Sequence, residues 1–137
     1  MTELERRAMV LTEEFDSLGD GFLRYSYLVE LAGLAPELPP ELLQDENLVS
    51  GCQSRVWLDV GAVDGKLTLT AHSDTRIICG FLEVLRVLYD GLAPAEAAAS
   101  TVDVLDLCRV GDHLDSHRNI GIRSIQSAIL RRAAKLD

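Results

Sequence analysis

The chain opens with hydrophobic residues spaced three or four positions apart, which is the period of a helix with one buried face. This stripe runs from Leu4 to Leu18, and Thr2 with Glu5 has the spacing of a capping box. The turn residues LGDG then interrupt the pattern before a second stripe over residues 22–32. It predicts a helix that ends at Gly33 and buries Phe22, Tyr25, Leu28, Val29 and Ala32.

Two strand patterns follow a segment that opposes regular structure. Residues 34–50 contain three prolines and predict a long connection, a kind of segment that is often functional. Positions 56–60 and 67–71 then alternate between hydrophobic and polar residues, which is the period of a strand. Because Asp64-Gly65 between them is a turn signal, the sequence predicts an antiparallel hairpin.

The remaining pattern is helical. Dense apolar residues predict a central, buried third helix that Ser73 or Asp74 caps and that ends near Gly91. Two short helices are expected next, one at Pro94 and one from Asp103 through Cys108. After the loop VGDHLDSH, a closing helix is expected to bury Ile122, Ile125, Ala128, Ile129 and Ala133. Two helices, a hairpin and further helices predict an α+β fold, with a small antiparallel sheet packed against several helices.

Length and charge narrow the class of protein. The chain has 137 residues, which predicts one domain over residues 1–137. Its net charge of -9 argues against nucleic acid as a partner, because phosphate binding needs basic residues. Residues 1–46 carry 11 acidic and 3 basic groups, which either steer a basic partner or simply solvate the surface. Without a long apolar run or a secretory signal, we expect a cytoplasmic protein with no membrane partner.

Generic catalytic signatures are absent from the sequence. The two lysines, Lys66 and Lys135, occupy positions expected to be exposed, which argues against a pyridoxal phosphate enzyme. His113 and His117 have a spacing seen in metal sites, but no third ligand is evident, and a polar loop and helix start explains them better. His72 falls on the polar face of a strand and is expected to be solvated. We therefore expect neither a metal nor another cofactor.

The three cysteines are odd in number and form no C-x-x-C pair, which argues against disulfides and a zinc site. Cys79 and Cys108 lie in apolar segments and are expected to be buried and inert. Cys52 follows Gly51 at the end of the long connection, where a thiol can be presented to a partner. This context alone leaves a reactive and an inert role for Cys52 equally open.

A resemblance to a known family bears on that choice. The string GCQSRVWL, residues 51–58, resembles the signature of the SufE family of sulfur-accepting proteins in iron-sulfur cluster assembly. The similarity continues in HSDTRIICGFLEVLRVLYDGLAP (72–94), YLVELAGLAPELP (27–39) and HLDSHRNIGI (113–122). It implies the α+β fold that this family shares with IscU-type scaffolds, with the acceptor cysteine on a loop.

The resemblance also implies a function. A pyridoxal phosphate-dependent cysteine desulfurase (SufS-like) would pass persulfide sulfur to Cys52. The sulfur would then move to an iron-sulfur scaffold complex (SufBCD-like). The protein would be a cosubstrate and activator of the desulfurase rather than an enzyme with independent turnover, and the persulfide would be its covalent cargo.

Other positions take secondary roles in this resemblance. Gly51, Gln53, Ser54 and Arg118 match the family and are expected to support the loop, while Arg118 equally fits an ordinary ion pair. Trp57 is expected to pack as a strand residue. The chain departs from the family at His117, Asn119 and Ile120, so partner contacts are not carried over there.

Two other functions remain open. An iron-binding cluster scaffold of the IscU type would need several converging ligands, which the apolar settings of Cys79 and Cys108 disfavour. An adaptor domain would leave all three cysteines inert.

Overall fold

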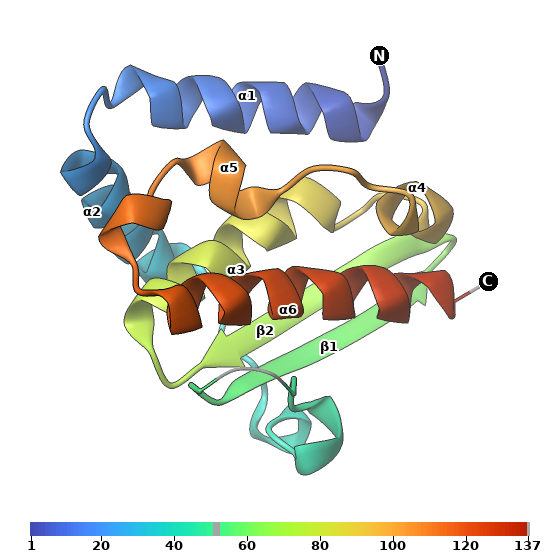
Figure 1. The fold of residues 1–137 in the computed structure, drawn as a ribbon. Helices are drawn as coiled ribbons and strands as arrows, with labels where there is room; N and C mark the ends of the chain where they lie inside the picture. The colour runs from blue at the N-terminus through green and yellow to red at the C-terminus, as the bar shows by residue number, and fades with distance from the viewer. Residues whose placement is uncertain (51–52, 137) are drawn as a thin grey trace.

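The computed structural model describes residues 1–50 and 53–136, and these residues form six α-helices and a two-stranded antiparallel sheet. The helices are α1 (Glu3–Ser17), α2 (Gly21–Leu31), α3 (Arg76–Tyr89), α4 (Pro94–Ala98), α5 (Val104–Cys108) and α6 (Ser116–Ala134), and the strands are β1 (Val56–Val63) and β2 (Lys66–Ser73). Figure 1 shows the hairpin packed against α6 and α3, with α1 on the opposite side of α3 and α5. The predicted α+β class is therefore confirmed.

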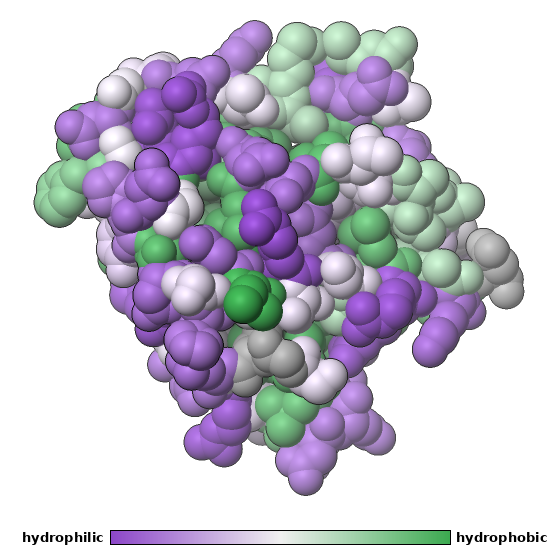
Figure 2. Space-filling view, in the orientation of Figure 1, coloured by the Kyte–Doolittle hydropathy of each residue, from purple (hydrophilic) through white to green (hydrophobic). Residues whose placement is uncertain are grey.

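The core is built around α3. Ten of its fourteen residues are buried, and the helix contacts α1, α2, α5, α6 and β2. A helix with so little polar surface is stable only when other elements enclose it. The predicted central position of the third helix is thus confirmed. On the face drawn in Figure 2, hydrophilic residues gather at the left and centre and hydrophobic ones toward the upper right.

The hairpin follows the predicted alternation. Val56 pairs with Ser73 and Val63 with Lys66, so that the strands are in register along their full length. Asp64 and Gly65 have φ values of 53° and 76°. Positive φ at both central residues is the requirement of a type I′ turn, which matches the twist of the strands. The turn thereby fixes the register that brings β1 and β2 together at the Val56 end.

The prediction that Phe22 is buried on the inner face of α2 is wrong. Phe22 is 67% exposed, whereas Arg24 is only 8% exposed. Arg24 lies one turn before Leu28, which is fully buried, so the two residues share the face that packs inward. The long aliphatic stem of an arginine can fill such a position while its charged end reaches a polar environment.

The start of α3 also differs from the prediction. Its N-cap residue is Thr75, which makes no side-chain capping bond. Ser73 remains in β2 as the pairing partner of Val56, and its hydroxyl accepts a 3.2 Å bond from the backbone N–H of Thr75. Asp74 Oδ1 instead accepts from the backbone N–H of Arg55 at 3.2 Å. Strand pairing therefore moves the helix start past both predicted caps.

The connection between α2 and β1 contains three short 3₁₀ turns rather than a longer element, at Ala32–Leu34, Pro40–Leu42 and Asp45–Asn47. Its end pairs with the hairpin, because Leu48 bridges Trp57 and the N–H of Val49 donates to Val56 O at 2.9 Å. These bonds bring the end of the connection next to the start of β1. Among the described residues, none of the helices has the length and apolar composition needed to cross a membrane.

Candidate functional site

The centre of the predicted site, Gly51 and Cys52, lies outside the described residues. The candidate site is therefore described from Gln53 and Ser54, which follow these two residues in the chain, and from the side chains that contact Gln53 and Ser54. Gln53 and Ser54 precede β1, at the same end of the fold where α3 and α6 begin.

A chain of hydrogen bonds connects three separate segments at Ser54. The hydroxyls of Ser54 and Thr75 are 2.6 Å apart, and Arg118 Nη1 donates to Ser54 Oγ at 3.2 Å. Thr75 Oγ1 donates in turn to Asp74 Oδ1 at 3.3 Å. Because Thr75 uses its proton for the carboxylate, Ser54 is the donor between the two hydroxyls. The chain therefore runs from a guanidinium to a carboxylate through two hydroxyl groups.

Asp74 also holds the residue after Ser54 through its backbone. Its Oδ1 accepts from the N–H of Arg55, its own N–H donates to Arg55 O at 3.3 Å, and Arg55 Nε lies 3.6 Å from Asp74 Oδ2. Both side chains are exposed, so the ion pair itself adds little stability. The two backbone bonds are what fix the segment before β1 against the start of α3.

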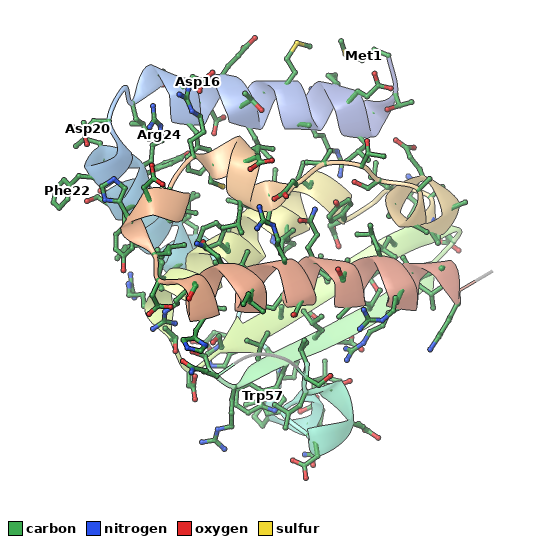
Figure 3. The ribbon with its side chains drawn as sticks, in the orientation of Figure 1. Met1, Asp16, Asp20, Phe22, Arg24 and Trp57 are labelled. Carbon is green, nitrogen blue, oxygen red and sulfur yellow. The ribbon has the colours of Figure 1, made fainter. Side chains whose placement is uncertain are left out.

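Trp57 packs on the outer face of the hairpin. Its ring stacks on His72 with centroids 5.9 Å apart, and the Arg55 guanidinium carbon is 5.7 Å from its centroid. Figure 3 shows Trp57 beside the turn of the connection that pairs with β1. The side chain thus packs as a strand residue, as predicted, and His72 is exposed apart from this stacking.

A small cavity of about 50 Å³ lies behind the hydrogen-bonded chain. Its lining residues are Gln53, Ser54, Val56, Ile78, His117, Arg118 and Gly121. Val56 and Ile78 are buried and supply an apolar wall, while the α6 residues supply a polar one. The cavity therefore combines a dry side with a cationic side.

The N-termini of α3 and α6 meet at this cavity. Arg118 lies in the first turn of α6, where Asp115 caps the helix by accepting from the Arg118 N–H at 2.8 Å. Helix N-termini carry partial positive charge, to which the Arg118 guanidinium adds a full one. The α6 side of the cavity therefore carries positive potential, which the Asp115 and Asp74 carboxylates at the two helix starts partly offset.

Of the predicted supporting residues, Ser54 and Arg118 contact each other directly, and Gln53 lines the same cavity. The side chain of Arg118 therefore bonds a hydroxyl of the loop segment. Thr75 and Ile78 were missed as members of the site. The Ser-Asp helix start in the family resemblance pointed to the segment, but no pattern within it singled out Thr75.

His113 and His117 lie in different elements of the structure. His113 ends a 3₁₀ turn, Gly111–His113, and its imidazole packs on Gly21 of α2, whereas His117 is exposed in the first turn of α6. They do not share one helix face as a four-residue spacing would require. Within residues 1–50 and 53–136, no three His, Cys, Asp or Glu side chains form a group that could hold a metal ion.

The two described cysteines differ in environment. Cys108 is fully buried, and this burial raises the pKa of its thiol. Cys79 was expected to be equally buried, but it is only half-buried, and its thiol donates to Ser73 O at 3.2 Å. The first turn of α3 sits at the sheet end rather than deep in the core, which leaves this position partly open.

We expect alkylation to separate these two thiols. At pH 8, iodoacetamide should modify Cys108 at least about 100-fold more slowly than Cys79, because the raised pKa keeps the Cys108 thiol protonated and the core excludes the reagent. Peptide mapping by mass spectrometry measures both rates. In urea the two should react alike, whereas similar rates in the folded protein would contradict the described burial.

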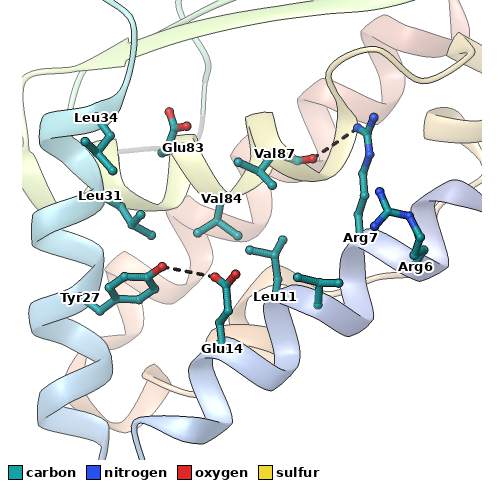
Figure 4. A pocket seen from close by; sticks show the side chains of 11 residues that line it. Arg6, Arg7, Leu11, Glu14, Tyr27, Leu31, Leu34, Glu83, Val84 and Val87 are labelled. Atoms are coloured by element: carbon teal, nitrogen blue, oxygen red, sulfur yellow. Dashed lines mark hydrogen bonds between the residues drawn. The ribbon is translucent and has the colours of Figure 1, made fainter.

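A larger, mainly apolar groove of about 400 Å³ lies between α1, α2 and α3, away from this site (Figure 4). Polar contacts border it at two points. Tyr27 donates to Glu14 Oε2 at 3.2 Å, and Arg7 Nη1 donates to three carbonyls at the end of α3, the shortest bond being 2.6 Å to Asp90 O. These contacts fasten α1 to its neighbours and share no residue with the cavity at Ser54.

Comparisons with known proteins agree with this architecture. The family described as SufE, Fe-S metabolism associated domain, matches residues 9–133. An uncharacterised SufE-like protein of Rhizobium meliloti (strain 1021) is 33% identical over 132 residues, which cover 91% of this chain and 90% of that protein.

A solved structure shares the fold. The solution structure of a hypothetical protein from Thermus thermophilus superposes with a TM-score of 0.74, covering 93% of this chain and 96% of that one, at 22% identity. The family match spans most of the chain, and the relative exceeds 30% identity over nearly its full length. The chain therefore belongs to the SufE family of proteins associated with Fe-S metabolism.

Proposed function

We propose that this protein accepts persulfide sulfur on Cys52 from a pyridoxal phosphate-dependent cysteine desulfurase (SufS-like) and passes it on for iron-sulfur cluster assembly. The observation that carries the proposal is the bond from Arg118 to Ser54, two residues after Cys52, at the meeting point of two helix N-termini. Membership of a family associated with Fe-S metabolism supports the same role.

The transfer is a thiol–persulfide exchange. The Cys52 thiolate attacks the terminal sulfur of the desulfurase persulfide, a new S–S bond forms on Cys52, and the old S–S bond breaks. The desulfurase cysteine leaves as a thiolate, so that one sulfur atom moves and the charge is conserved. Neither a metal nor another cofactor is needed in this protein for that step.

Positive charge near the acceptor suits this chemistry. A thiolate is the nucleophile, and cationic groups and helix N-termini lower a thiol's pKa. Arg118 and the first turns of α3 and α6 supply such groups beside the segment that follows Cys52. Their effect continues after transfer, because the persulfide is also anionic.

The cavity beside Ser54 suits protection of the carried sulfur. Its volume of about 50 Å³ is enough for a sulfur atom, and Val56 and Ile78 give it an apolar wall. Shielding would limit attack by reductants and oxidants between the two transfers. Docking of the desulfurase would then expose the thiol, and transfer to Cys52 would regenerate the desulfurase cysteine, so that this protein would act as cosubstrate and activator without turnover of its own.

The proposed partners are this desulfurase and an iron-sulfur scaffold complex (SufBCD-like), in the cytoplasm. The acidic N-terminal third, with 11 acidic and 3 basic groups in residues 1–46, would steer basic partner surfaces. Free thiols and an odd cysteine count fit a reducing compartment.

Intact-mass spectrometry tests the acceptor role. The protein is incubated with a matched, active desulfurase and free cysteine, the thiols are then alkylated, and the modified peptide is mapped. We expect one added sulfur on Cys52 and none in Cys52→Ser, since serine has no sulfur nucleophile. Cys79→Ser is the matched control, and it should accept sulfur like the unmodified sequence.

Two results would overturn this function. Sulfur uptake that persists in Cys52→Ser would place the acceptor elsewhere, and no uptake from a desulfurase shown to turn over would remove the relay altogether. An iron-binding scaffold of the IscU type would instead show bound iron and visible absorption after anaerobic reconstitution.

A further inference from the structure

A polar cavity of about 400 Å³ lies between α2, α5 and α6, and it shares no residue with the cavity beside Ser54. Its polar lining consists of Arg24, Asp106, Arg109, Asp112, Asn119 and Arg123. Figure 2 shows strongly hydrophilic residues gathered over α5 and the adjoining end of α1. Arg24 extends from α2 toward α5 in Figure 3.

Arg24 is the unusual member of this set. It is only 8% exposed, and its Nε donates to Phe15 O at 3.0 Å. No carboxylate of the described residues forms an ion pair with it, unlike Arg109, which binds Asp16 at 2.7 Å. The stem of Arg24 is buried, while its terminal nitrogens are not among the buried atoms that lack a hydrogen-bond partner, and they open into the cavity. Its two terminal nitrogens are therefore available to an anionic group in the cavity.

Asn119 lines the same cavity, and its side-chain oxygen lacks a hydrogen-bond donor. Its Oδ1 is buried and accepts no hydrogen bond within the described residues, while its Nδ2 donates to Gly111 O at 3.3 Å. That donor bond sets which end of the amide is the free acceptor. An unsatisfied buried acceptor is rare enough to require an explanation. Because this oxygen is shielded from solvent, a ligand reaches it only when the Asn119 side chain turns toward the cavity, whereas Arg24 and Asp112 already offer a donor and an acceptor there.

The surrounding charges favour a ligand with both signs. Arg123 is already engaged by Asp103 at 3.2 Å and Asp106 at 3.9 Å. Asp112 forms no ion pair with any described residue, and it lines the cavity. Arg24 and Asp112 are therefore the two charges of the lining without an ion-pair partner among the described residues, and a ligand with a carboxylate and an ammonium group supplies one to each.

We propose that this cavity binds a free α-amino acid. The carboxylate pairs with the Arg24 guanidinium, and the ammonium group pairs with the exposed Asp112 carboxylate. Leu105, a buried residue of α5 that lines the cavity, offers an apolar surface to the amino acid's side chain. Binding involves no covalent step and does not depend on Cys52.

Side-chain NMR of the full chain tests the proposal. Titration with L-alanine or L-leucine up to about 20 mM should shift the Nε–H signal of Arg24 and the side-chain amide signal of Asn119 saturably. Acetate, which lacks the ammonium group, should bind at least about tenfold more weakly, as each lost charged hydrogen bond is worth about that factor or more. Inorganic phosphate should not compete.

Variants then locate the contacts. Arg24→Gln should weaken alanine binding at least about tenfold, whereas Arg6→Gln, a matched change on the exposed face of α1, should not alter it. Because Arg24→Gln also removes the hydrogen bond from Arg24 Nε to Phe15 O, Asp112→Asn serves as a second variant. It should weaken alanine binding while leaving acetate binding unchanged.

Three results would overturn the proposal. Absence of saturable shifts up to about 20 mM would show that the cavity holds only water. Phosphate binding as tightly as alanine would identify a general anion site. Equal weakening of alanine and acetate in Asp112→Asn would show that the ammonium group has no defined partner there.

Discussion

Replacing Gly80 by alanine is expected to lower the free energy of unfolding by about 3 kcal/mol, because α2 and α3 touch through their backbones at this residue. A Cβ on Gly80 would lie 2.2 Å from the carbonyl oxygen of Leu28 and 2.8 Å from its carbonyl carbon. Both atoms belong to the backbone of α2, so no side chain can rotate away. The two helices would have to separate within a close-packed core.

Helix propensity predicts the opposite sign for this change. Alanine is preferred over glycine by about 1 kcal/mol within a helix, so an open position would be stabilised. Gly33→Ala is the matched control, because a Cβ there meets only the end of the Arg76 side chain, at 3.4 Å. Urea unfolding followed by circular dichroism measures both variants. A Gly80→Ala protein as stable as the Gly33→Ala protein would disprove the close packing of α2 on α3.

The packing of Gly80 is also a part of the fold that the sequence pattern did not predict. The hydrophobic period predicted α3 and its central position, and the family resemblance included its internal glycine. Neither could say that the glycine faces Leu28, because that contact depends on how two helices cross. The same limit explains Phe22, since periodicity counts hydrophobic residues and cannot foresee that an arginine stem fills the inward position.

The hairpin was predictable because its signals are local. Alternation over each strand and the Asp64-Gly65 turn lie within a few residues of one another, and backbone sterics alone select the turn type. The start of α3 was not predictable in this way. Ser73 and Asp74 are good capping residues in isolation, but pairing with Val56 and Arg55 engages them first.

In the candidate site, too, the local motif was predictable from the sequence and the long-range contacts were not. The motif at residues 51–58 predicted which segment carries the chemistry, and the acceptor role of Cys52 stays a prediction. The contact between Ser54 and Arg118 spans 64 positions, and Thr75 joins it from a third segment. Such contacts follow from the packing of α3 and α6 against β1, which no local pattern encodes.

Arg118→Gln is expected to slow sulfur acceptance by Cys52 about tenfold to a hundredfold, if the proposed relay operates. The change removes a charged donor from Ser54 Oγ, and hydrogen bonds to charged groups contribute about 1.5–3 kcal/mol. It also removes a positive charge from the cavity, which should raise the thiol's pKa and reduce the thiolate fraction near neutral pH. The helix cap at Asp115 survives, because it uses the backbone N–H of Arg118.

Two readouts separate this positioning role from a general loss of structure. The rate at which Cys52 gains sulfur is followed by mass spectrometry, and its alkylation rate is measured against pH. The alkylation profile should move to higher pH in Arg118→Gln and move partly back in Arg118→Lys, which restores the charge without the planar donor group.

Arg131→Gln is the matched control, because it makes the same change at an exposed position near the other end of α6. It should leave both the sulfur rate and the pH profile unaltered. If Arg118→Gln slows sulfur acceptance while the alkylation profile stays in place, the charge of Arg118 does not act on the thiol, and its role is confined to holding Ser54. If neither readout changes, the hydrogen-bonded chain from Arg118 to Asp74 stabilises this end of the fold but takes no part in sulfur transfer.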